Sequence, residues 1–147
     1  MGYNLVKNIK IIIEYDGTNY SGWQIQKNAI SIQEEIQNSI FKITGEKTNI
    51  IGAGRTDAGA HAKGQVANFH TMSGIPEKQF ALALNSVLKE DIIIKDSSYT
   101  PMNFHARYDA KSKLYSYTIH RGKFPPAIMR KYIYHFKYNK LLDIEKL

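Results

Sequence analysis

Apolar and polar side chains alternate over residues 8–16, and this pattern predicts the first β-strand of the chain. Four apolar residues fall on one face of that strand: Ile9, Ile11, Ile13 and Tyr15. Ile12 makes the other face partly apolar as well, and Asp16-Gly17 marks a turn after the strand. The strand pattern recurs over residues 48–53, 65–70, 91–99 and 111–121.

Two other segments show the spacing of an amphipathic helix. The first begins at Ser31, which forms a capping box with Glu34 in which each side chain can satisfy the other's free backbone N–H. Gly45 is placed to end this helix. Its apolar stripe consists of Ile32, Ile36, Ile40 and Ile43. Pro76 opens the second helix. The apolar face of that helix consists of Phe80, Leu84, Val87 and Leu88.

The order of these elements is strand, helix, strand, strand, helix, strand, strand. Helices interleaved with hairpin-connected strands predict an α+β fold, a mainly antiparallel sheet with helices packed on one face. We predict one N-terminal α+β domain over residues 1–140. Residues 141–147 (LLDIEKL) show helical spacing without a cap, which indicates the start of a truncated second α+β domain.

The composition of the 147 residues, 43% hydrophobic and 22% charged, is typical of a folded globular domain. The chain has no cysteine, which excludes disulfides, thiol nucleophiles and Cys-ligated metal centres. No apolar run approaches the length that crosses a bilayer, and the N-terminus lacks the apolar stretch of a signal peptide. We therefore expect a cytoplasmic protein with no membrane contact.

The positive charge is concentrated in one window, residues 107–131, which carries +6 of the net charge of +7. Its basic residues are Arg107, Lys111, Lys113, Arg121, Lys123, Arg130 and Lys131. Aromatic residues lie between them and just beyond: Tyr108, Tyr115, Tyr117, Phe124, Tyr132 and Tyr134. Cations for phosphates and aromatic faces for bases are typical of a nucleic-acid-binding surface. A strand with solvated lysines on one face and tyrosines in the core explains the same pattern.

Residues 52–64 (GAGRTDAGAHAKG) join two predicted strands and carry the candidate chemistry. Their small side chains allow a ligand to approach the backbone closely, and Asp57 and Arg55 supply charge at the loop. A simple glycine-rich turn is the alternative. The loop lacks the Gly-Lys-Ser/Thr ending of a P-loop, which argues against a nucleotide-phosphate site.

Three nearby residues allow two interpretations each. Tyr20 and Trp23 flank Gly22 in a polar stretch, where they either stack on bases or close the edge of a core. His61 follows Asp57 by four residues, but no cysteine or carboxylate cluster accompanies it. We favour a structural role for His61 over a metal or acid–base role, and we predict no metal site.

Four segments together resemble the tRNA pseudouridine synthase A family: EYDGTNYSGWQ, GAGRTDAGAHAKGQVANF, NFHARYDA and KLYSY. The resemblance extends from about residue 9 to the end. GRTDAGAH matches the family's G-R-T-D-A-G-x-H segment, with Ala60 in its variable slot. The resemblance implies an isomerase that converts uridines 38 to 40 of the tRNA anticodon arm into pseudouridine, with no cofactor and no catalytic metal.

The resemblance also implies roles for single residues. Asp57 matches the catalytic aspartate, Arg55 the arginine that helps to extrude the target base, and Tyr115 the tyrosine that stacks on the uracil ring. Arg107, in the basic window, is a further substrate-binding candidate. Family members consist of two similar, ferredoxin-like α+β halves around a basic cleft and work as homodimers. The second half supplies another arginine that pairs with the aspartate, so we expect this chain to be inactive alone.

Pseudouridine forms when the bond from ribose to ring nitrogen breaks and carbon 5 of the uracil joins the ribose. The stacked base must first leave its helix. An ionised Asp57 can then attack the ribose, attack the ring, or abstract a proton to give a glycal, and the residues do not choose among these routes. Tyr115 offers an aromatic face and a phenol for the proton on carbon 5. A non-catalytic RNA-binding module remains the alternative.

Overall fold

A computed structural model describes residues 5–137, which divide at residue 111 into two compact units. The first unit contains two helices and a four-stranded antiparallel sheet, so the predicted α+β fold is confirmed. The predicted domain boundary at residue 140 and the predicted helix over 141–147 lie outside the described residues. None of the helices within 5–137 has the length and apolar character needed to cross a membrane.

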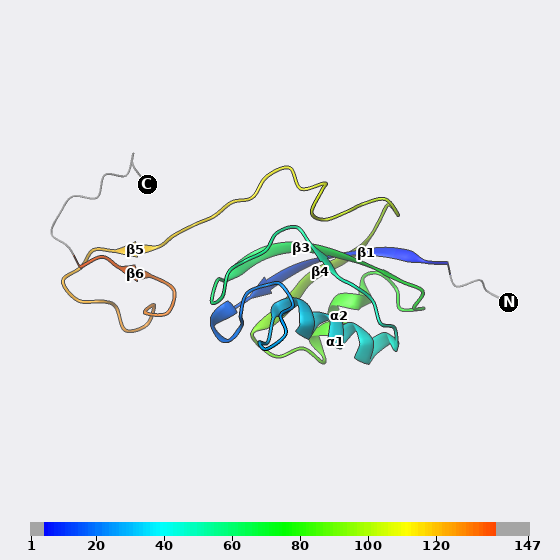
Figure 1. Ribbon diagram of the computed structural model, residues 1–147, viewed down its shortest axis with the longest axis horizontal. Coiled ribbons are helices and arrows are strands. Elements are labelled where there is room, and N and C mark those ends of the chain that lie inside the picture. The colour runs from blue at the N-terminus through cyan, green and yellow to red at the C-terminus, as the bar shows by residue number, and fades with distance from the viewer. Residues whose placement is uncertain (1–4, 138–147) are drawn as a thin grey trace. The chain divides into compact units, whose positions relative to one another are not determined.

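The sheet of the first unit has the strand order β2-β3-β1-β4 (Figure 1). Its strands are β1 (Lys7–Tyr15), β2 (Ile51–Gly52), β3 (Ala62–Thr71) and β4 (Ile92–Thr100). The central strand β1 pairs antiparallel with β3 and with β4, so that Ile11 lies between Ala67 and Ser97. The strands predicted from residues 8, 48, 65 and 91 onward are therefore present, the second of them reduced to two residues.

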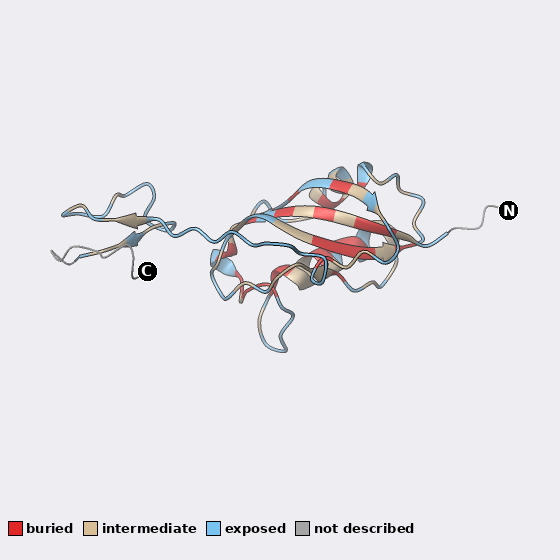
Figure 2. Ribbon diagram, turned by 90° about the horizontal axis from the view of Figure 1, so that it is seen from above, coloured by how far each residue is buried: buried red, intermediate tan, exposed pale blue. Residues whose placement is uncertain are grey.

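The core lies between the sheet and the helices α1 (Ile32–Thr44) and α2 (Gln79–Asn85), which are both drawn below the strands in Figure 1. Ile9, Ile11, Ile13 and Tyr15 of β1 are buried in it, as the alternation predicts, and Figure 2 shows buried residues alternating with less buried ones along strands of the sheet. Phe69 of β3 meets Phe80 of α2 edge to face, with ring centroids 5.5 Å apart. The helical stripe of Ile32, Ile36 and Ile40 is fully buried in the same cluster.

Helix α1 begins and ends where its capping residues predict. The hydroxyl of Ser31 accepts a hydrogen bond of 3.2 Å from the backbone N–H of Glu34. Gly45 stands at the other end with φ of 74°, and its N–H donates to the carbonyl of Phe41. Local sequence chemistry therefore suffices to delimit this helix.

Helix α2 is shorter than predicted at both ends, because it begins at Gln79 rather than at Pro76 and ends at Asn85, before Val87 and Leu88. The hydroxyl of Ser97, on β4, accepts from the N–H of Ala81 and donates to the carbonyl of Glu77. These are the two groups that a helix starting at Pro76 would join directly. Ser97 therefore takes the place of a helical hydrogen bond, and this long-range contact is invisible in the periodicity.

The second unit contains a pair of parallel two-residue strands, β5 (Ile119–His120) and β6 (Tyr134–His135). The predicted strand over residues 111–121 is therefore wrong except at 119–120. Alternation is only part of what a strand needs, because its backbone groups also require a partner. No strand in the part of the chain described here pairs with residues 111–117, where Tyr115 and Tyr117 are exposed, whereas the carbonyl of Thr118 accepts from the N–H of Tyr134 on β6.

Candidate functional site

Residues 52–64, the aspartate loop, include the connection from β2 to β3, as predicted, although β3 already begins at Ala62. The N–H of Ala53 donates to the carbonyl of Val66 over 2.8 Å, which continues the strand pairing into the loop. Farther along, the N–H of Ala60 donates to the carbonyl of Asp57 over 3.1 Å. This closes a four-residue turn whose third residue, Gly59, has φ of 77°, a conformation that favours glycine.

The backbone of residues 15–23, the support segment, holds the aspartate loop on both sides of Asp57. The N–H of Trp23 donates to the carbonyl of Thr56 over 3.1 Å, and the N–H of Gly59 donates to the carbonyl of Tyr20 over 3.1 Å. Both bonds join segments more than 30 residues apart. The loop is therefore fixed by tertiary contacts within two residues of Asp57 on either side.

Side-chain contacts add to these backbone bonds. The hydroxyl groups of Tyr15 and Thr56 share a hydrogen bond of 2.8 Å. The N–H of Gly17 donates to Nδ1 of His61 over 3.0 Å, and the same nitrogen lies 3.0 Å from Oδ1 of Asp16. These contacts support the structural role expected for His61. Among residues 5–137 no group of three or more His, Cys, Asp and Glu side chains is placed to hold a metal ion.

The support segment approaches the aspartate loop so closely that neither Gly17 nor Gly22 tolerates a side chain. Gly22 has φ of 84°, and a Cβ atom there would collide with the carbonyl oxygen of Thr56. Gly52 is similarly crowded, because its Cβ would collide with the indole of Trp23. The small residues of the two segments thus serve contact between the segments themselves as well as access for a ligand.

Trp23 and Tyr20 belong to the core, with 2% and 5% of their surfaces exposed. The alternative in which they stack on bases is therefore wrong, and the core interpretation is confirmed. Burial of the Trp23 indole against Gly52 explains why large aromatic residues stand in an otherwise polar stretch.

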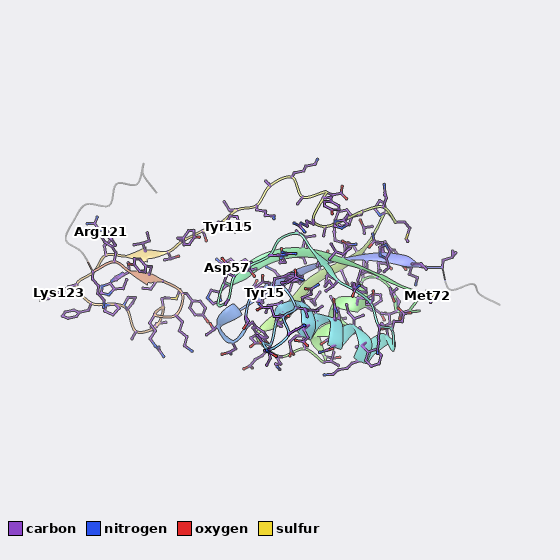
Figure 3. The ribbon with its side chains drawn as sticks, in the orientation of Figure 1. Tyr15, Asp57, Met72, Tyr115, Arg121 and Lys123 are labelled. Atoms are coloured by element: carbon purple, nitrogen blue, oxygen red, sulfur yellow. The ribbon has the colours of Figure 1, made fainter. Side chains whose placement is uncertain are left out.

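The side chains of Arg55 and Asp57 are exposed on this anchored loop. Within residues 5–137, neither has a hydrogen-bonding or ion-pairing partner. Figure 3 shows Asp57 and Tyr15 toward one end of the sheet and Met72 at the other. A fixed backbone that carries an unpaired carboxylate and guanidinium is suited to binding a ligand, because both groups are available for it.

The two other predicted residues lie elsewhere. Arg107 is exposed in the first unit, next to buried Ala106. Tyr115 lies in the second unit, with 66% of its surface exposed. The first unit therefore presents three of the four predicted residues, Arg55, Asp57 and Arg107, on its surface.

A buried asparagine pair that the sequence analysis missed holds the segment of Arg107. Oδ1 of Asn68 accepts from the N–H of Ala106 over 2.9 Å, and Nδ2 of Asn68 donates to Oδ1 of Asn8 over 2.9 Å. Asn8 in turn donates to the carbonyl of Phe104 over 3.0 Å. Asparagine is disfavoured within strands, so its presence at Asn8 and Asn68 was a usable signal.

The buried phenols of the support segment lead to a prediction about alkaline pH. Burial, followed by the 2.6 Å hydrogen bond to Asp91, raises the pKa of Tyr20, and burial raises the pKa of Tyr15. A raised pKa in the folded state means that the stabilisation is complete below about pH 10 and declines as the pH rises further. We expect the free energy of unfolding to fall above that pH by up to about 1.4 kcal/mol per pH unit for each tyrosine.

Urea unfolding between pH 8 and 11 measures this decline, with Tyr20→Phe as the comparison. The variant lacks one titrating phenol, so its stability should fall less steeply than that of the wild type above pH 10. Equal slopes for the two proteins would contradict the prediction.

The first unit is thus an α+β domain that presents an arginine and an aspartate on an anchored glycine-rich loop. A family model described as tRNA pseudouridine synthase matches residues 11–109. The chain therefore belongs to the tRNA pseudouridine synthase family, and the resemblance inferred from its motifs is confirmed.

Curated relatives extend the match to nearly the whole chain. The chain is 54% identical to tRNA pseudouridine synthase A of Acetivibrio thermocellus over 142 residues, which cover 97% of this chain and 57% of the relative. It is 56% identical to the protein of the same name from Caldicellulosiruptor saccharolyticus, over 96% of this chain and 58% of the relative. The chain thus spans somewhat more than half the length of these relatives.

Proposed function

We propose that this protein, at the full length of its relatives, converts uridine to pseudouridine in the anticodon stem-loop of tRNA, at positions 38 to 40. The observation that carries the proposal is the position of Asp57. Its carboxylate is exposed and unpaired within residues 5–137, on a loop held by tertiary hydrogen bonds on both sides, in a chain of this family. We use the term full-length protein for a protein that contains this chain and has the length of these relatives.

In this proposal Asp57 is the catalytic carboxylate. It acts on an extruded uridine, either by covalent attack or by proton abstraction. A carboxylate enclosed with a substrate loses solvation and tends to take up a proton, so it needs a cation nearby to stay ionised. The exposed Asp57 side chain has room for such a partner, which the resemblance assigns to an arginine beyond this chain.

Arg55, two residues earlier on the same loop, is proposed to fill the space that the base leaves. Its planar guanidinium can stack on a neighbouring base and bind phosphate. Arg107 is exposed, and the buried Asn8–Asn68 pair holds the preceding residue, Ala106, which suits a contact of Arg107 with the tRNA backbone. The tRNA affinity of Arg55 and Arg107 variants, measured against salt concentration, tests both assignments.

Tyr115 is proposed to stack on the detached uracil ring. Its ring is largely exposed and therefore available for such a contact. A Tyr115→Phe variant keeps the ring and removes the hydroxyl. If that variant retains activity, the role of Tyr115 is stacking. If activity is lost, the Tyr115 hydroxyl also takes up the proton from carbon 5.

Three further parts of the proposal rest on the resemblance. The full-length protein is a homodimer, it acts in the cytoplasm where its tRNA substrate is found, and the 147-residue chain alone is inactive. Sedimentation of the full-length protein tests the first part, and the location of a tagged protein in cells tests the second.

The direct test of function is to map pseudouridine in tRNA from cells with and without the intact gene. We expect pseudouridine at positions 38 to 40 to disappear without the gene and to return when the full-length protein is restored. Restoring the 147-residue chain instead should leave the tRNA unmodified. Unchanged pseudouridine in cells that lack the gene would contradict the proposal.

A non-catalytic RNA-binding module is the second candidate, because residues 107–131 carry most of the net charge. In that case the gene is dispensable for pseudouridine formation, and Asp57 matters only slightly for affinity. The mapping experiment therefore separates the two functions.

A further inference from the structure

One hydrogen bond of the first unit joins the end of the central strand to the residue before Asp57. Tyr15 is the last residue of β1, and only 2% of its surface is exposed. Its hydroxyl lies 2.8 Å from the hydroxyl of Thr56. The Tyr15 ring packs beside the buried Trp23 indole, with centroids 6.2 Å apart, so the phenol has little freedom to move.

Thr56 is consequently held at two points. Its carbonyl accepts from the N–H of Trp23, and its side chain bonds to Tyr15. The first contact fixes the peptide plane that leads into Asp57, and the second fixes the Thr56 side chain. The carbonyl of Asp57 then accepts from Ala60, which closes the turn. The direction in which the Asp57 side chain leaves the backbone is thereby determined, although that side chain is itself exposed.

A purely structural role is the alternative for this bond. A single intramolecular hydrogen bond contributes about 1 kcal/mol, which is small beside the sixteen-residue apolar cluster of the first unit. The fold therefore does not depend on it. Catalysis is more sensitive, because a displacement of about 1 Å at the reacting group can lower a rate by about 100-fold.

We propose that Tyr15 and Thr56 are a positioning pair, which orients the Asp57 carboxylate toward the reacting uridine through their shared hydrogen bond. The proposal rests on the function proposed above. Neither residue touches the substrate; both act through Asp57. Without the bond, residues 55–58 adopt several conformations, so the conformation that directs the Asp57 carboxylate at the uridine is less populated.

The test uses Tyr15→Phe, Thr56→Val and the double variant of the full-length protein, assayed by single-turnover pseudouridine formation on tRNA. Each single variant removes one hydroxyl of the pair. We expect the rate constant to fall about tenfold in each and the tRNA affinity to stay within about twofold. Because the two hydroxyls form one bond, the double variant should lose no more than either single variant. Thr56→Ser keeps the hydroxyl and should retain at least half of the wild-type rate.

Thr71→Val is the matched control. Thr71 is a buried threonine near the opposite end of β3, and its hydroxyl donates to Glu46 over 2.5 Å. This variant should lose stability like Thr56→Val while keeping the wild-type rate within about twofold. Additive losses in the double variant, or unchanged rates in both single variants, would overturn the positioning pair.

Amide hydrogen exchange separates this proposal from the proposed function. The N–H groups of Gly59 and Ala60 are hydrogen-bonded within the anchored loop. We expect them to exchange at least about tenfold faster in Tyr15→Phe, whether or not the protein modifies tRNA. A wild-type protein that forms no pseudouridine would therefore refute only the proposed function. Unchanged amide exchange in Tyr15→Phe would refute the positioning pair.

Discussion

The Asp57→Asn variant of the full-length protein is expected to form pseudouridine at least about 10⁴-fold more slowly than the wild type. Asparagine has nearly the same shape as aspartate but no negative charge, so it can neither attack covalently nor take a proton. Because Asp57 is exposed and unpaired within residues 5–137, the substitution should leave the fold unchanged. Release of tritium from carbon 5 of labelled uridine in tRNA measures the rate.

Binding of tRNA should survive in the same variant, within about threefold of the wild-type affinity, because the basic residues remain. Asp96→Asn is a suitable control, since Asp96 is an exposed carboxylate on β4 and does not belong to the aspartate loop. It should change neither rate nor affinity. A rate in Asp57→Asn within tenfold of the wild type would remove Asp57 from the mechanism and favour the RNA-binding module.

Replacing Gly22 with alanine should strongly destabilise the first unit, because two costs coincide there. The φ of 84° is unfavourable for alanine by about 1–2 kcal/mol, and contact of the new Cβ with the Thr56 carbonyl adds about 1–3 kcal/mol. We expect the free energy of unfolding to fall by about 2–5 kcal/mol in urea titration. The rate of pseudouridine formation should fall as well, since the collision pushes the aspartate loop away from its support.

Alanine substitutions at two other glycines distinguish the backbone strain from the steric collision. Gly45 has φ of 74° with nothing near its hypothetical Cβ, so Gly45→Ala carries only the strain. Gly64 has neither a positive φ nor a close neighbour, and Gly64→Ala should change stability by less than about 0.5 kcal/mol. Losses of equal size in Gly22→Ala and Gly45→Ala would show that the approach of the two segments contributes nothing.

Local patterns in the sequence were enough to predict much of the first unit. The alternation on β1 and the caps at Ser31 and Gly45 act between residues close in the chain, so their meaning does not depend on the rest of the fold. The aspartate loop was likewise predicted between two strands, with Arg55 and Asp57 on it. Such features are readable because periodicity and capping are short-range effects.

Contacts between distant segments account for what the sequence did not reveal. The hydroxyl of Ser97 delays the start of α2, and the segment containing Lys111 to Tyr117 alternates like a strand but has no partner among the described strands. Neither effect leaves a local signature. A backbone hydrogen bond needs its partner in space, and only the folded chain supplies it.

The candidate site shows the same division. The residue types around Asp57 identified the loop, but its anchoring on Tyr15 and Trp23 requires residues more than 30 positions earlier to fold against it. Trp23 was ambiguous for this reason: a tryptophan in a polar stretch is buried only if another segment covers it, as Gly52 does here. Local sequence identifies the chemical groups of the site, and long-range packing fixes the directions in which they point.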